Sequence, residues 1–385
     1  MRLLLITQDF PPDTGGIETY SFELARRFHR HAEQFAVIAP AKKDSAVDRE
    51  LPYPVFRLPV RNSLLPLAAP VLVTYLSNRR HFDTVFHAQW QTAGASLLSR
   101  KLGYPRNIYV AAHARELLTA PFYDNGTRLN GMLNRVRKIL FSRVTAFFPV
   151  SQYTAELLRM EGVPNEKIRV ITNGTDPERF RPEEQPDLAK RLNAGNKPVV
   201  VTVCRLVRRK GIDLVLRALE RLQKQGQDFV YIIGGSGPEE QNLKQLADTL
   251  GLTERVHFAG RIPGDQLAAY YNLADLFVMP ARAEPPDVEG FGITFLEANA
   301  CGVPVIGTKT GGIPDAVIDG KTGFLIEENN IDQLTSCMAR LIEDPEMAER
   351  MGTNGRNRVI KQMTWDQVAE KLLENMERIN RKSQR

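Results

Sequence analysis

Residues 198–240 read PVVVTVCRLVRRKGIDLVLRALERLQKQGQDFVYIIGGSGPEE and contain a complete strand–helix–strand unit. The apolar run at 198–203 predicts a strand, the helical spacing of apolar residues at 211–224 predicts a helix, and the run at 229–234 predicts a second strand. A glycine-rich turn and another helical pattern at 239–250 follow directly. Short strands that are apolar throughout and alternate with helices are typical of a parallel sheet covered on both faces.

The same alternation fills the rest of the chain. Apolar runs in the first half predict strands at 2–7, 34–39, 56–59, 84–87, 107–113 and 146–151. In the second half they predict further strands at 256–259, 276–279 and 303–307. A length of 385 residues is enough for two domains with separate cores. We therefore expect an α/β fold of two doubly wound domains facing across a deep cleft, with ligands beyond the carboxyl ends of the strands.

A polar segment at 181–197 contains two prolines and separates the two series of strands. It is the predicted linker between a first domain at 1–180 and a second at 198–365. The tail at 366–385 is predicted to form one helix that packs back on the first domain.

Composition excludes several classes of protein. Apolar residues make up 43% and charged residues 25%, which is ordinary for a globular domain and unlike a disordered or fibrous chain. No run approaches about 18 consecutive apolar residues, so we expect no spanning helix. The apolar stretch between Arg2 and Thr7 is too short to direct export. Cys204, Cys301 and Cys337 are isolated from one another, which argues against a disulfide framework or a zinc site and favours a cytoplasmic protein.

The charge is unevenly distributed. The chain carries a net charge of +6, and residues 1–180 hold 24 Lys and Arg against 16 Asp and Glu, whereas the remainder holds 27 against 29. An anionic small molecule, an anionic membrane or nucleic acid would each suit a basic first half, and so would a merely solubilising basic face. Nucleic acid is disfavoured because no known nucleic-acid-binding module is present.

Two turns after predicted strands suit a bound phosphate. Gly15 and Gly16 follow the first strand and precede a helix predicted at 16–30, whose N–H groups can face an anion. Arg205 and Lys210 follow the strand at 198–203, where a guanidinium and an ammonium can hold different oxygens of a diphosphate. The neighbouring Arg208 and Arg209 are alternative ligands, and a solvated basic turn is the simpler interpretation. The glycine-rich turn at Gly235 lacks the lysine of a P-loop. A role of its glycines in packing and a role in ligand binding are therefore equally supported.

The segment EPPDVEGFGITFLEANACGVPVIG at 284–307 is the most informative. Gly290 and Gly292 lie just before a predicted helix and leave backbone N–H groups for a phosphate or a sugar oxygen. Glu289 precedes this turn. Glu297 lies in a largely apolar helix and needs partners if buried; a ribose diol is a good one, and exposure to solvent is the alternative.

His113 ends an apolar strand, at the edge of the sheet where ligands are expected. A structural role is the competing interpretation of a lone histidine. No spacing of histidines in the chain fits a metal site, so we expect no metal.

Taken together, these motifs resemble the GT-B glycosyltransferases, in particular the large retaining family conventionally numbered four. The resemblance covers nearly the whole chain, through PPDTGG, VSQYT, ITNGTDPERF, CRLVRRKG, GGSGP, FAGRI, EGFGITFLEA, GVPVIGTKTGGIPDAV and GKTGFL. The two glutamates Glu289 and Glu297, eight residues apart, form its most specific motif. Within the family, DVEGFGITFLEA and the basic first half are most similar to bacterial phosphatidylinositol mannoside mannosyltransferases.

The resemblance implies a role for each matching residue. It implies donor binding by Gly16, Arg205, Lys210, Gly235, Arg261, Ile262, Gly290, Phe291, Gly292 and Glu297, and catalytic roles for His113 and Glu289. Arg205 and Lys210 would hold the diphosphate, and Glu297 would hold the ribose. The transferred sugar would contact Glu289, the adjoining backbone N–H groups and His113. The backbone at 261–262 would meet the base, and the Gly16 turn would approach the phosphate from the opposite domain. Cys204 and Thr175 depart from the family pattern without removing a ligand.

The implied activity is the retaining transfer of a hexose from a nucleotide-diphosphate sugar to a hydroxyl of a lipid-linked or other glycan or polyol acceptor. GDP-mannose is the favoured donor, and a UDP-sugar remains open; the donor is a substrate, and no cofactor is implied. Two alternatives remain: a nucleotide-sugar epimerase of the same architecture, and a non-catalytic nucleotide-binding protein. A glycosidase is disfavoured because its two catalytic carboxylates must face each other across roughly 5–10 Å. Here one glutamate lies before a turn and the other on the helix that follows it, which does not suit that arrangement.

The sequence at 128–148 is a basic amphipathic helix, in which Arg135, Lys138 and Arg143 alternate with apolar residues. Such a helix can lie on anionic lipid, which predicts peripheral contact with the inner face of a membrane. Equally, its apolar side can pack on the sheet.

Overall fold

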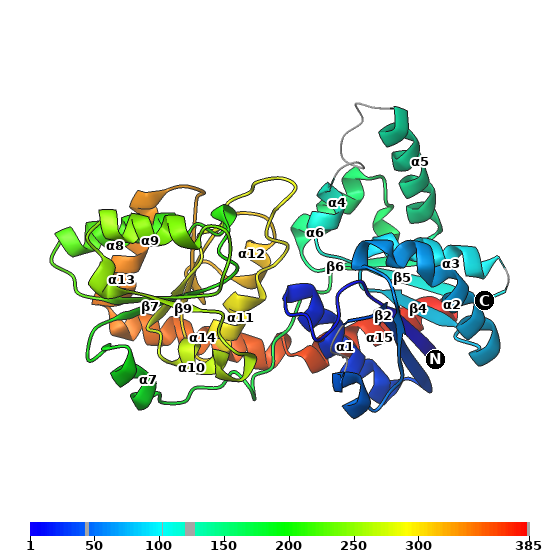
Figure 1. Cartoon of the computed structure of the whole chain (residues 1–385), viewed down its shortest axis with the longest axis horizontal. Coiled ribbons are helices and arrows are strands. Elements are labelled where there is room, and N and C mark those ends of the chain that lie inside the picture. The colour runs from blue at the N-terminus through cyan, green and yellow to red at the C-terminus, as the bar shows by residue number, and fades with distance from the viewer. Residues whose placement is uncertain (43–45, 102, 120–127, 383–385) are drawn as a thin grey trace. The chain divides into compact units, whose positions relative to one another are not determined.

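The computed structural model describes residues 1–42, 46–101, 103–119 and 128–382 (Figure 1). The chain forms two compact units, one made of Met1–Asn173 with Trp365–Arg385 and the other of Gly174–Thr364. Each unit contains one six-stranded sheet, and every strand pairing within the sheets is parallel. The predicted α/β class is therefore confirmed for both halves.

The first sheet has the strand order β3-β2-β1-β4-β5-β6. Its strands are β1 (Arg2–Ile6), β2 (Gln34–Pro40), β3 (Val55–Leu58), β4 (Thr84–His87), β5 (Asn107–Ala112) and β6 (Ala146–Pro149). All six were predicted, with ends within two residues of the observed ones. The order reverses between β1 and β4, so the loops after these two strands flank the switch point.

Helices cover both faces of the first sheet. They are α1 (Gly16–His31), α2 (Leu65–Arg80), α3 (Ala93–Arg100), α4 (Arg115–Leu118), α5 (Arg128–Arg143), α6 (Gln152–Met160) and α15 (Trp365–Lys382). Short 3-10 turns lie at Ala46–Glu50, Asn62–Leu64, Trp90–Thr92 and Asn165–Lys167. On one face Leu65, Val73 and Leu76 of α2 pack into a buried cluster with Leu4 and Ile6 of β1. On the other, the Phe28 ring of α1 meets Phe86 of β4 edge-on, with centroids 5.5 Å apart.

The second sheet has the order β12-β11-β10-β7-β8-β9. Its strands are β7 (Val199–Val203), β8 (Val230–Gly234), β9 (Val256–Gly260), β10 (Leu276–Val278), β11 (Val305–Thr308) and β12 (Gly323–Ile326). Five of them were predicted. The apolar runs did not predict β12, because it has four residues and starts with a glycine. A side chain at Gly323 would collide with the carbonyl oxygen of Val305 on the neighbouring strand.

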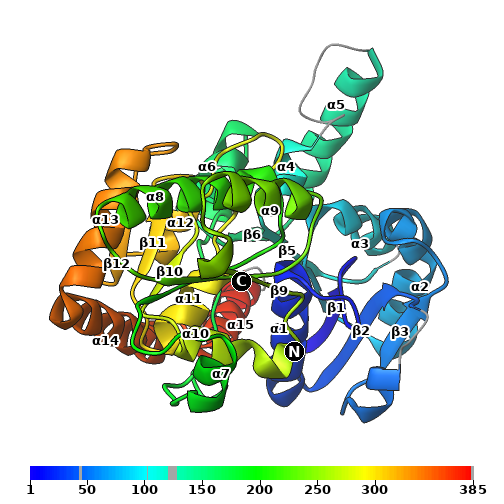
Figure 2. The same cartoon turned by 60° about the vertical axis from the view of Figure 1, so that its left-hand side comes forward.

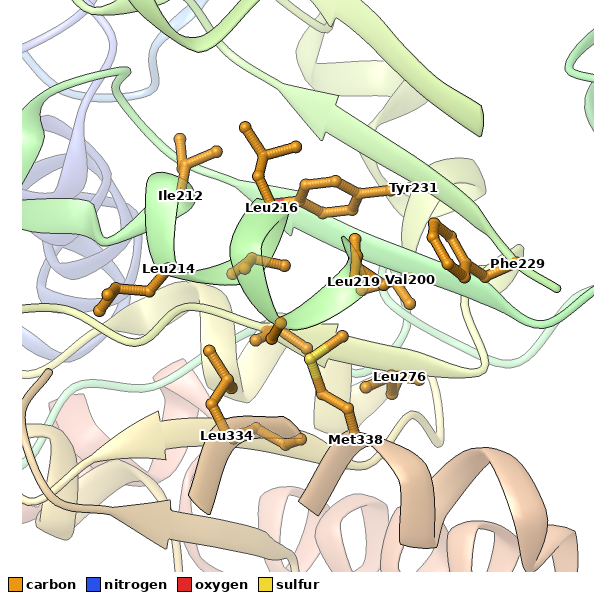
Figure 3. Close-up of a cluster of buried hydrophobic side chains, with 14 of the residues drawn as sticks. Val200, Ile212, Leu214, Leu216, Leu219, Phe229, Tyr231, Leu276, Leu334 and Met338 are labelled. Carbon is orange, nitrogen blue, oxygen red and sulfur yellow. The ribbon is translucent and has the colours of Figure 1, made fainter. Parts of the chain in front are cut away.

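The helices of the second unit are α7 (Pro186–Arg191), α8 (Ile212–Lys224), α9 (Glu240–Thr249), α10 (Leu267–Asn272), α11 (Ile293–Ala300), α12 (Ile313–Ala316), α13 (Ile331–Glu343) and α14 (Pro345–Gln362). Their 3-10 turns are Arg208–Lys210, Thr253–Arg255 and Gly264–Gln266. Helices α8 and α9 lie over one face of the sheet, and α10 and α11 lie over the other (Figure 2). Leu216 and Leu219 of α8 pack with Tyr231 of β8 and Met338 of α13 in the buried cluster drawn in Figure 3.

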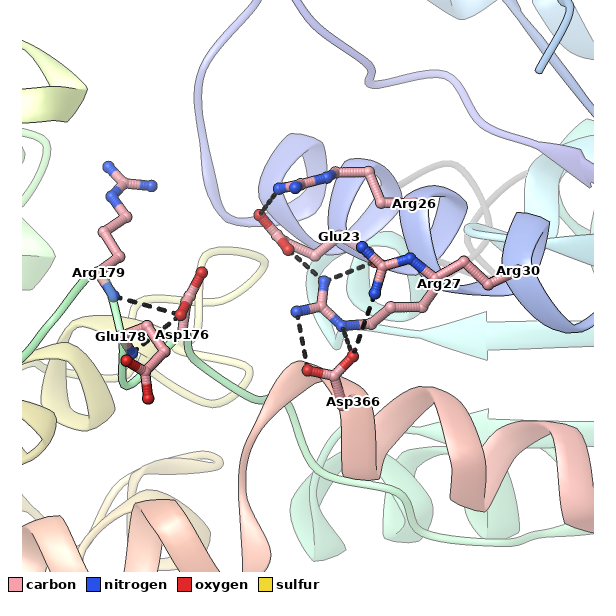
Figure 4. A network of polar contacts seen from close by, with 8 residues as sticks. All are labelled: Glu23, Arg26, Arg27, Arg30, Asp176, Glu178, Arg179 and Asp366. Atoms are coloured by element: carbon pink, nitrogen blue, oxygen red, sulfur yellow. Dashed lines mark hydrogen bonds and ion pairs between the residues drawn. The ribbon is translucent and has the colours of Figure 1, made fainter. Parts of the chain in front are cut away.

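The C-terminal helix α15 belongs to the first unit, although it follows the second unit in sequence. The buried Arg27 of α1 donates from Nε to Asp366 of α15 at 2.9 Å and also pairs with Glu23 (Figure 4). Farther along α15, the hydroxyl of Tyr109 donates to Asn380 Oδ1 at 2.6 Å. These contacts join α15 to α1 and to β5.

The chain passes from the first unit to the second after Asn173, earlier than the predicted linker at 181–197. Residues 174–197 belong to the second unit and include α7. The N–H of Thr175 donates to Met363 O at 2.9 Å, and the ring of Phe180 packs edge-on against Tyr271. The polar composition of this segment hides its few buried apolar residues, which is why it was predicted to be a linker.

Candidate functional site

Glycine-rich turns bring the loops that follow β7 and β8 together. The N–H of Cys204 donates to Gly234 O, and the N–H of Leu206 donates to Ser236 O, both at 3.0 Å. Gly235 has a φ of 128°, and a Cβ there would collide with the carbonyl oxygen of Cys204. The packing interpretation of this glycine therefore has a direct structural basis.

The loop after β9 lies against the same turn. The N–H of Gly235 donates to Gly260 O at 2.7 Å. The side chain of Ile262 occupies the space that a Cβ on Gly234 would need. Arg261, beside it, is exposed to solvent. These loops follow neighbouring strands on one side of the switch point between β7 and β10.

A carboxylate and two cations form the centre of the site. Oε2 of Glu289 accepts hydrogen bonds from Lys210 Nζ at 2.5 Å and from Arg209 Nη1 at 2.8 Å. Lys210 is 8% exposed, and its Nζ also lies 3.4 Å from the Met279 sulfur. Glu289 follows β10 and Lys210 follows β7, so the ion pair spans 79 residues of sequence.

Glycines place the backbone on both sides of this ion pair. Gly211 directly follows Lys210 with a φ of 72°, and a Cβ there would collide with Pro280 O. Gly311, after β11, has a φ of 54°, and a Cβ there would collide with the carbonyl oxygen of Glu289. That carbonyl accepts the N–H of Gly312 at 2.8 Å. Larger residues would push these loops apart.

The electrostatics of the cluster keep Glu289 ionised. Burial by itself would raise the pKa of Glu289, but Lys210 and Arg209 together lower it to about 2. The group is therefore a carboxylate throughout the neutral range. It can orient cations and accept hydrogen bonds from sugar hydroxyls, but it has no proton to donate.

Backbone donors lie next to Glu289. Gly292 has a φ of 89° and is the N-cap of α11. Among the described residues, none accepts a hydrogen bond from the N–H groups of Gly290, Phe291 or Gly292. These N–H groups and the start of α11 can together face an anion or a sugar oxygen.

Glu297 lies one turn into α11 and is half-buried. Its Oε2 accepts the hydroxyl of the buried Tyr271 at 2.8 Å. Burial raises the pKa of Glu297, while Tyr271 and Arg179 oppose the increase. Arg179 belongs to a short turn closed by Asp176, whose Oδ1 accepts the N–H groups of Glu178 and Arg179 (Figure 4). The alternative interpretation, in which the Glu297 side chain is exposed to solvent, is therefore not supported.

Arg205 lies in the same loop as Lys210 but is exposed, and it pairs with no acidic side chain in the described ranges. Of the cations in this loop, Arg209 and Lys210 contact Glu289, whereas Arg208 pairs with Glu284 at 3.4 Å. The sequence alone left open which of these cations would be ligands. The structure brings Lys210 and Arg209 together with Glu289 and leaves Arg205 open to solvent.

The first unit contains His113 and Gly16. Nε2 of His113 donates to Ala88 O at 2.9 Å, and its backbone N–H donates to Glu116 Oε1 at 2.6 Å. Burial lowers the pKa of His113 to about 4 although the Ala88 carbonyl opposes this, so the ring is neutral near pH 7. Gly16 begins α1, and a Cβ there would meet nothing within 4 Å. The carboxylate of Glu18 lies against Gly15, at the start of the same helix.

Sequence reasoning missed two partners of these residues, Tyr271, which holds Glu297, and Glu116, which holds the His113 backbone, and a third residue, Arg282, which bonds to Asp213 just after the cationic turn. No local pattern marks them, because the first and third act across 26 and 69 residues. A hint for Glu116 was its position three residues after His113.

The helix predicted at 128–148 is α5, which ends at Arg143 before β6 begins at Ala146, and part of its apolar side packs on the first unit. Phe141 packs its ring against Trp90, and Arg137 is buried in an ion pair with Glu161 at 2.5 Å. Met132, Val136 and Ile139 are nevertheless exposed. The side chains of residues 128–131, at the start of the predicted segment 128–148, lie outside the described residues.

Helix α2 exposes a second apolar surface that the sequence did not predict. Leu67, Val71 and Tyr75 are 79%, 80% and 57% exposed and recur every four residues. Helices α2, α3 and α5 contain no Asp or Glu. Contacts join α2 to α3 and α3 to α5. None of the helices in the described part of the chain combines the length and apolar character needed to cross a bilayer.

Two protein-family models match the chain. The model described as Glycosyltransferase Family 4 matches residues 14–179, and the model described as Glycosyl transferases group 1 matches residues 184–358. Over 378 residues the chain is 33% identical to the GDP-mannose-dependent alpha-(1-6)-phosphatidylinositol monomannoside mannosyltransferase of Mycolicibacterium smegmatis, covering 94% of this chain and 95% of that protein. The enzyme of the same name from Mycobacterium tuberculosis H37Rv is 34% identical, with 96% and 97% covered.

Solved structures match the whole fold. Sucrose-phosphate synthase from Thermosynechococcus elongatus superposes with a TM-score of 0.81 at 22% identity, covering 98% of this chain and 99% of that chain. The Anabaena protein HepE, in complex with UDP and glucose, superposes with a TM-score of 0.78 at 23% identity over 98% and 99%. At these identities the similarity concerns the fold alone.

Proposed function

Because the chain belongs to glycosyltransferase family 4, whose members transfer a sugar from a nucleotide sugar, we propose that this enzyme moves a mannosyl residue from GDP-mannose to a hydroxyl of a lipid-linked glycan or polyol. The two six-stranded parallel sheets with flanking helices are those of the GT-B architecture. The full-length similarity to two GDP-mannose-dependent mannosyltransferases supports the choice of donor.

One observation carries the site assignment: at the carboxyl ends of the strands, Lys210 and Arg209 converge on Glu289. The backbone N–H groups of residues 290–292 lie next to this cluster and have no acceptor in the part of the chain that the structure describes. We assign the donor diphosphate to Lys210, Arg205 and those N–H groups. Breaking the bond from the sugar to the diphosphate places negative charge on the bridging oxygen. Fixed positive groups stabilise that charge without reorganising.

Glu289 acts in this proposal as a permanent anion. Its low pKa excludes a role as proton donor at neutral pH, so it accepts hydrogen bonds from the sugar hydroxyls and orients Lys210. The half-buried Glu297, held by Tyr271, accepts the two hydroxyls of the ribose. We propose a catalytic role for His113 as a neutral ring, because its pKa lies well below 7. We further propose that the configuration at the anomeric carbon is retained.

A lipid-linked acceptor is supported by the surface of the first unit. Helix α2 exposes Leu67, Val71 and Tyr75, with Arg79 over the Tyr75 ring, and helix α5 exposes Ile139 beside the exposed Lys138. Apolar residues can enter the interface of an anionic membrane while the cations face its headgroups. This arrangement would bring the enzyme to its acceptor at a membrane surface.

The proposal is tested by incubating the enzyme with radiolabelled GDP-mannose or UDP-glucose, with vesicles that contain or lack phosphatidylinositol monomannoside. We expect label in the lipid fraction only with GDP-mannose and the acceptor vesicles, with one GDP released per sugar transferred. Transfer from UDP-glucose alone would overturn the choice of donor. Conversion of the donor to an epimer without any acceptor would favour an epimerase instead.

A further inference from the structure

The 3-10 turn Arg208–Lys210 has only three residues, yet it must hold Lys210 in a defined position. Within the turn, the N–H of Lys210 donates to Val207 O at 3.0 Å and the N–H of Gly211 donates to Arg208 O at 3.1 Å. Two such bonds are weak support for an isolated turn. Other elements must therefore fix it.

Arg282, four residues beyond the end of β10, supplies that support. Its Nη1 donates to the carbonyl of Arg208 at 3.0 Å, and its backbone N–H donates to the carbonyl of Arg209 at 2.7 Å. One residue therefore binds two consecutive carbonyls of the turn. These two carbonyls belong to the peptide bonds that join Arg208 to Arg209 and Arg209 to Lys210. The side chains of Arg209 and Lys210 contact Glu289.

All three nitrogens of the Arg282 guanidinium donate hydrogen bonds. Nη1 and Nη2 donate to the two oxygens of Asp213 at 2.9 and 2.7 Å, and Nε donates to Asn329 Oδ1 at 2.6 Å. Asp213 lies in the first turn of α8, just after the cationic turn, and Asn329 lies between β12 and α13. Arg282 is 8% exposed, so it has little access to bulk solvent or to a ligand.

We propose that Arg282 is a positioning residue for the donor diphosphate: by binding the backbone of residues 208 and 209 and the carboxylate of Asp213, it holds Lys210 and Arg209 at the distance from Glu289 that the diphosphate requires. This inference rests on the proposed function. It requires an arginine, because a lysine has one donor nitrogen and cannot reach Asp213, Asn329 and the Arg208 carbonyl together.

The test compares the affinities for GDP and GMP by calorimetry in the full-length protein. If Arg282 positions the turn that holds the diphosphate, R282K lowers the GDP affinity by about tenfold or more and changes the GMP affinity by less than about twofold. The GDP-to-GMP affinity ratio therefore falls. The matched control is R221K, which alters an exposed ion pair with Asp332 on the same unit and should keep the wild-type ratio.

Two results would overturn the inference. An R282K protein with the wild-type ratio would show that Arg282 does not position the turn. An equal loss of both affinities would mean that Arg282 only supports the fold. If R282K does not fold, D213N is measured in its place, since it removes the carboxylate that orients the guanidinium, and an unchanged ratio there has the same meaning. A wild-type protein that does not prefer GDP to GMP, or UDP to UMP, would instead count against the proposed function.

Discussion

Nζ of Lys210 lies 2.5 Å from Oε2 of Glu289, and the same oxygen also accepts a hydrogen bond from Arg209. Two cations thus share one carboxylate oxygen, and the three side chains together keep a net positive charge. A buried ion pair is weak evidence for stability, because desolvation offsets the attraction. A net positive cluster next to backbone N–H groups that have no acceptor among the described residues is better explained by an anionic ligand.

Replacing Lys210 tests this explanation. We expect K210A to lower kcat by about 100-fold or more, because a fixed charge facing the leaving diphosphate is removed. The fold should survive, since Glu289 keeps Arg209 as a partner. Initial transfer rates and a melting curve measure both effects. The control is K224A, which removes an exposed lysine paired with Glu220. Wild-type rates in K210A would contradict the assignment.

Replacing Glu297 tests the ribose contact. We expect wild-type enzyme to bind GDP more tightly than 2′-deoxy-GDP, because the carboxylate accepts from the ribose hydroxyls. E297Q should lose most of this preference, about tenfold or more, since hydrogen bonds to a charged group are the stronger kind. Y271F should lose part of it, because the Tyr271 hydroxyl orients the carboxylate. If the preference persists in E297Q, the ribose is bound elsewhere.

The exposed face of α2 is expected to drive membrane attachment. The double variant L67D/V71D should reduce binding to phosphatidylglycerol vesicles by about tenfold or more, because two apolar side chains can no longer enter the interface. Vesicle sedimentation measures the bound fraction. M160D replaces a residue of similar exposure on α6 and should bind as wild type does. Equal binding by all three proteins would exclude α2 as the attachment surface.

Glu116 makes the stability of the first unit depend on pH. Burial raises its pKa from 4.5 to about 7, although backbone hydrogen bonds from His113 and Glu116 oppose the increase. Between these values the folded state holds a proton that the unfolded state has lost. Its contribution to stability is therefore complete below pH 4.5 and is lost as the pH rises through 7.

E116Q cannot ionise, so it should lack this dependence. We expect the free energy of unfolding of wild type, relative to that of E116Q, to fall by about 2–3 kcal/mol between pH 5 and pH 8. Denaturant titrations at each pH measure it. E156Q removes an exposed carboxyl of the same unit and should follow the wild-type curve. Parallel curves for wild type and E116Q would mean that Glu116 ionises normally.

The sequence predicted the strands well because strands of a parallel sheet are buried on both faces and appear as continuous apolar runs. Helix α2 was not predicted because it is apolar on both sides. Leu67 and Val71 lie on its exposed side and Val73 on its buried side, so the sequence shows no helical period. The site motifs were found because glycines and charged residues at strand ends are local features. Packing between distant segments decides which cation contacts Glu289. It also decides that Tyr271 binds Glu297 and that Arg282 binds the turn at 208–210, so no local pattern predicts these contacts.

The central claim is that the second unit holds the donor diphosphate on Lys210, which contacts Glu289, and on Arg205 of the same loop. A crystal structure with bound GDP tests it most directly. We expect the phosphate oxygens within about 3 Å of Lys210 Nζ and the Arg205 guanidinium, with the ribose hydroxyls on Glu297. GDP bound away from these residues, with the Lys210–Glu289 pair facing empty solvent, would contradict the claim.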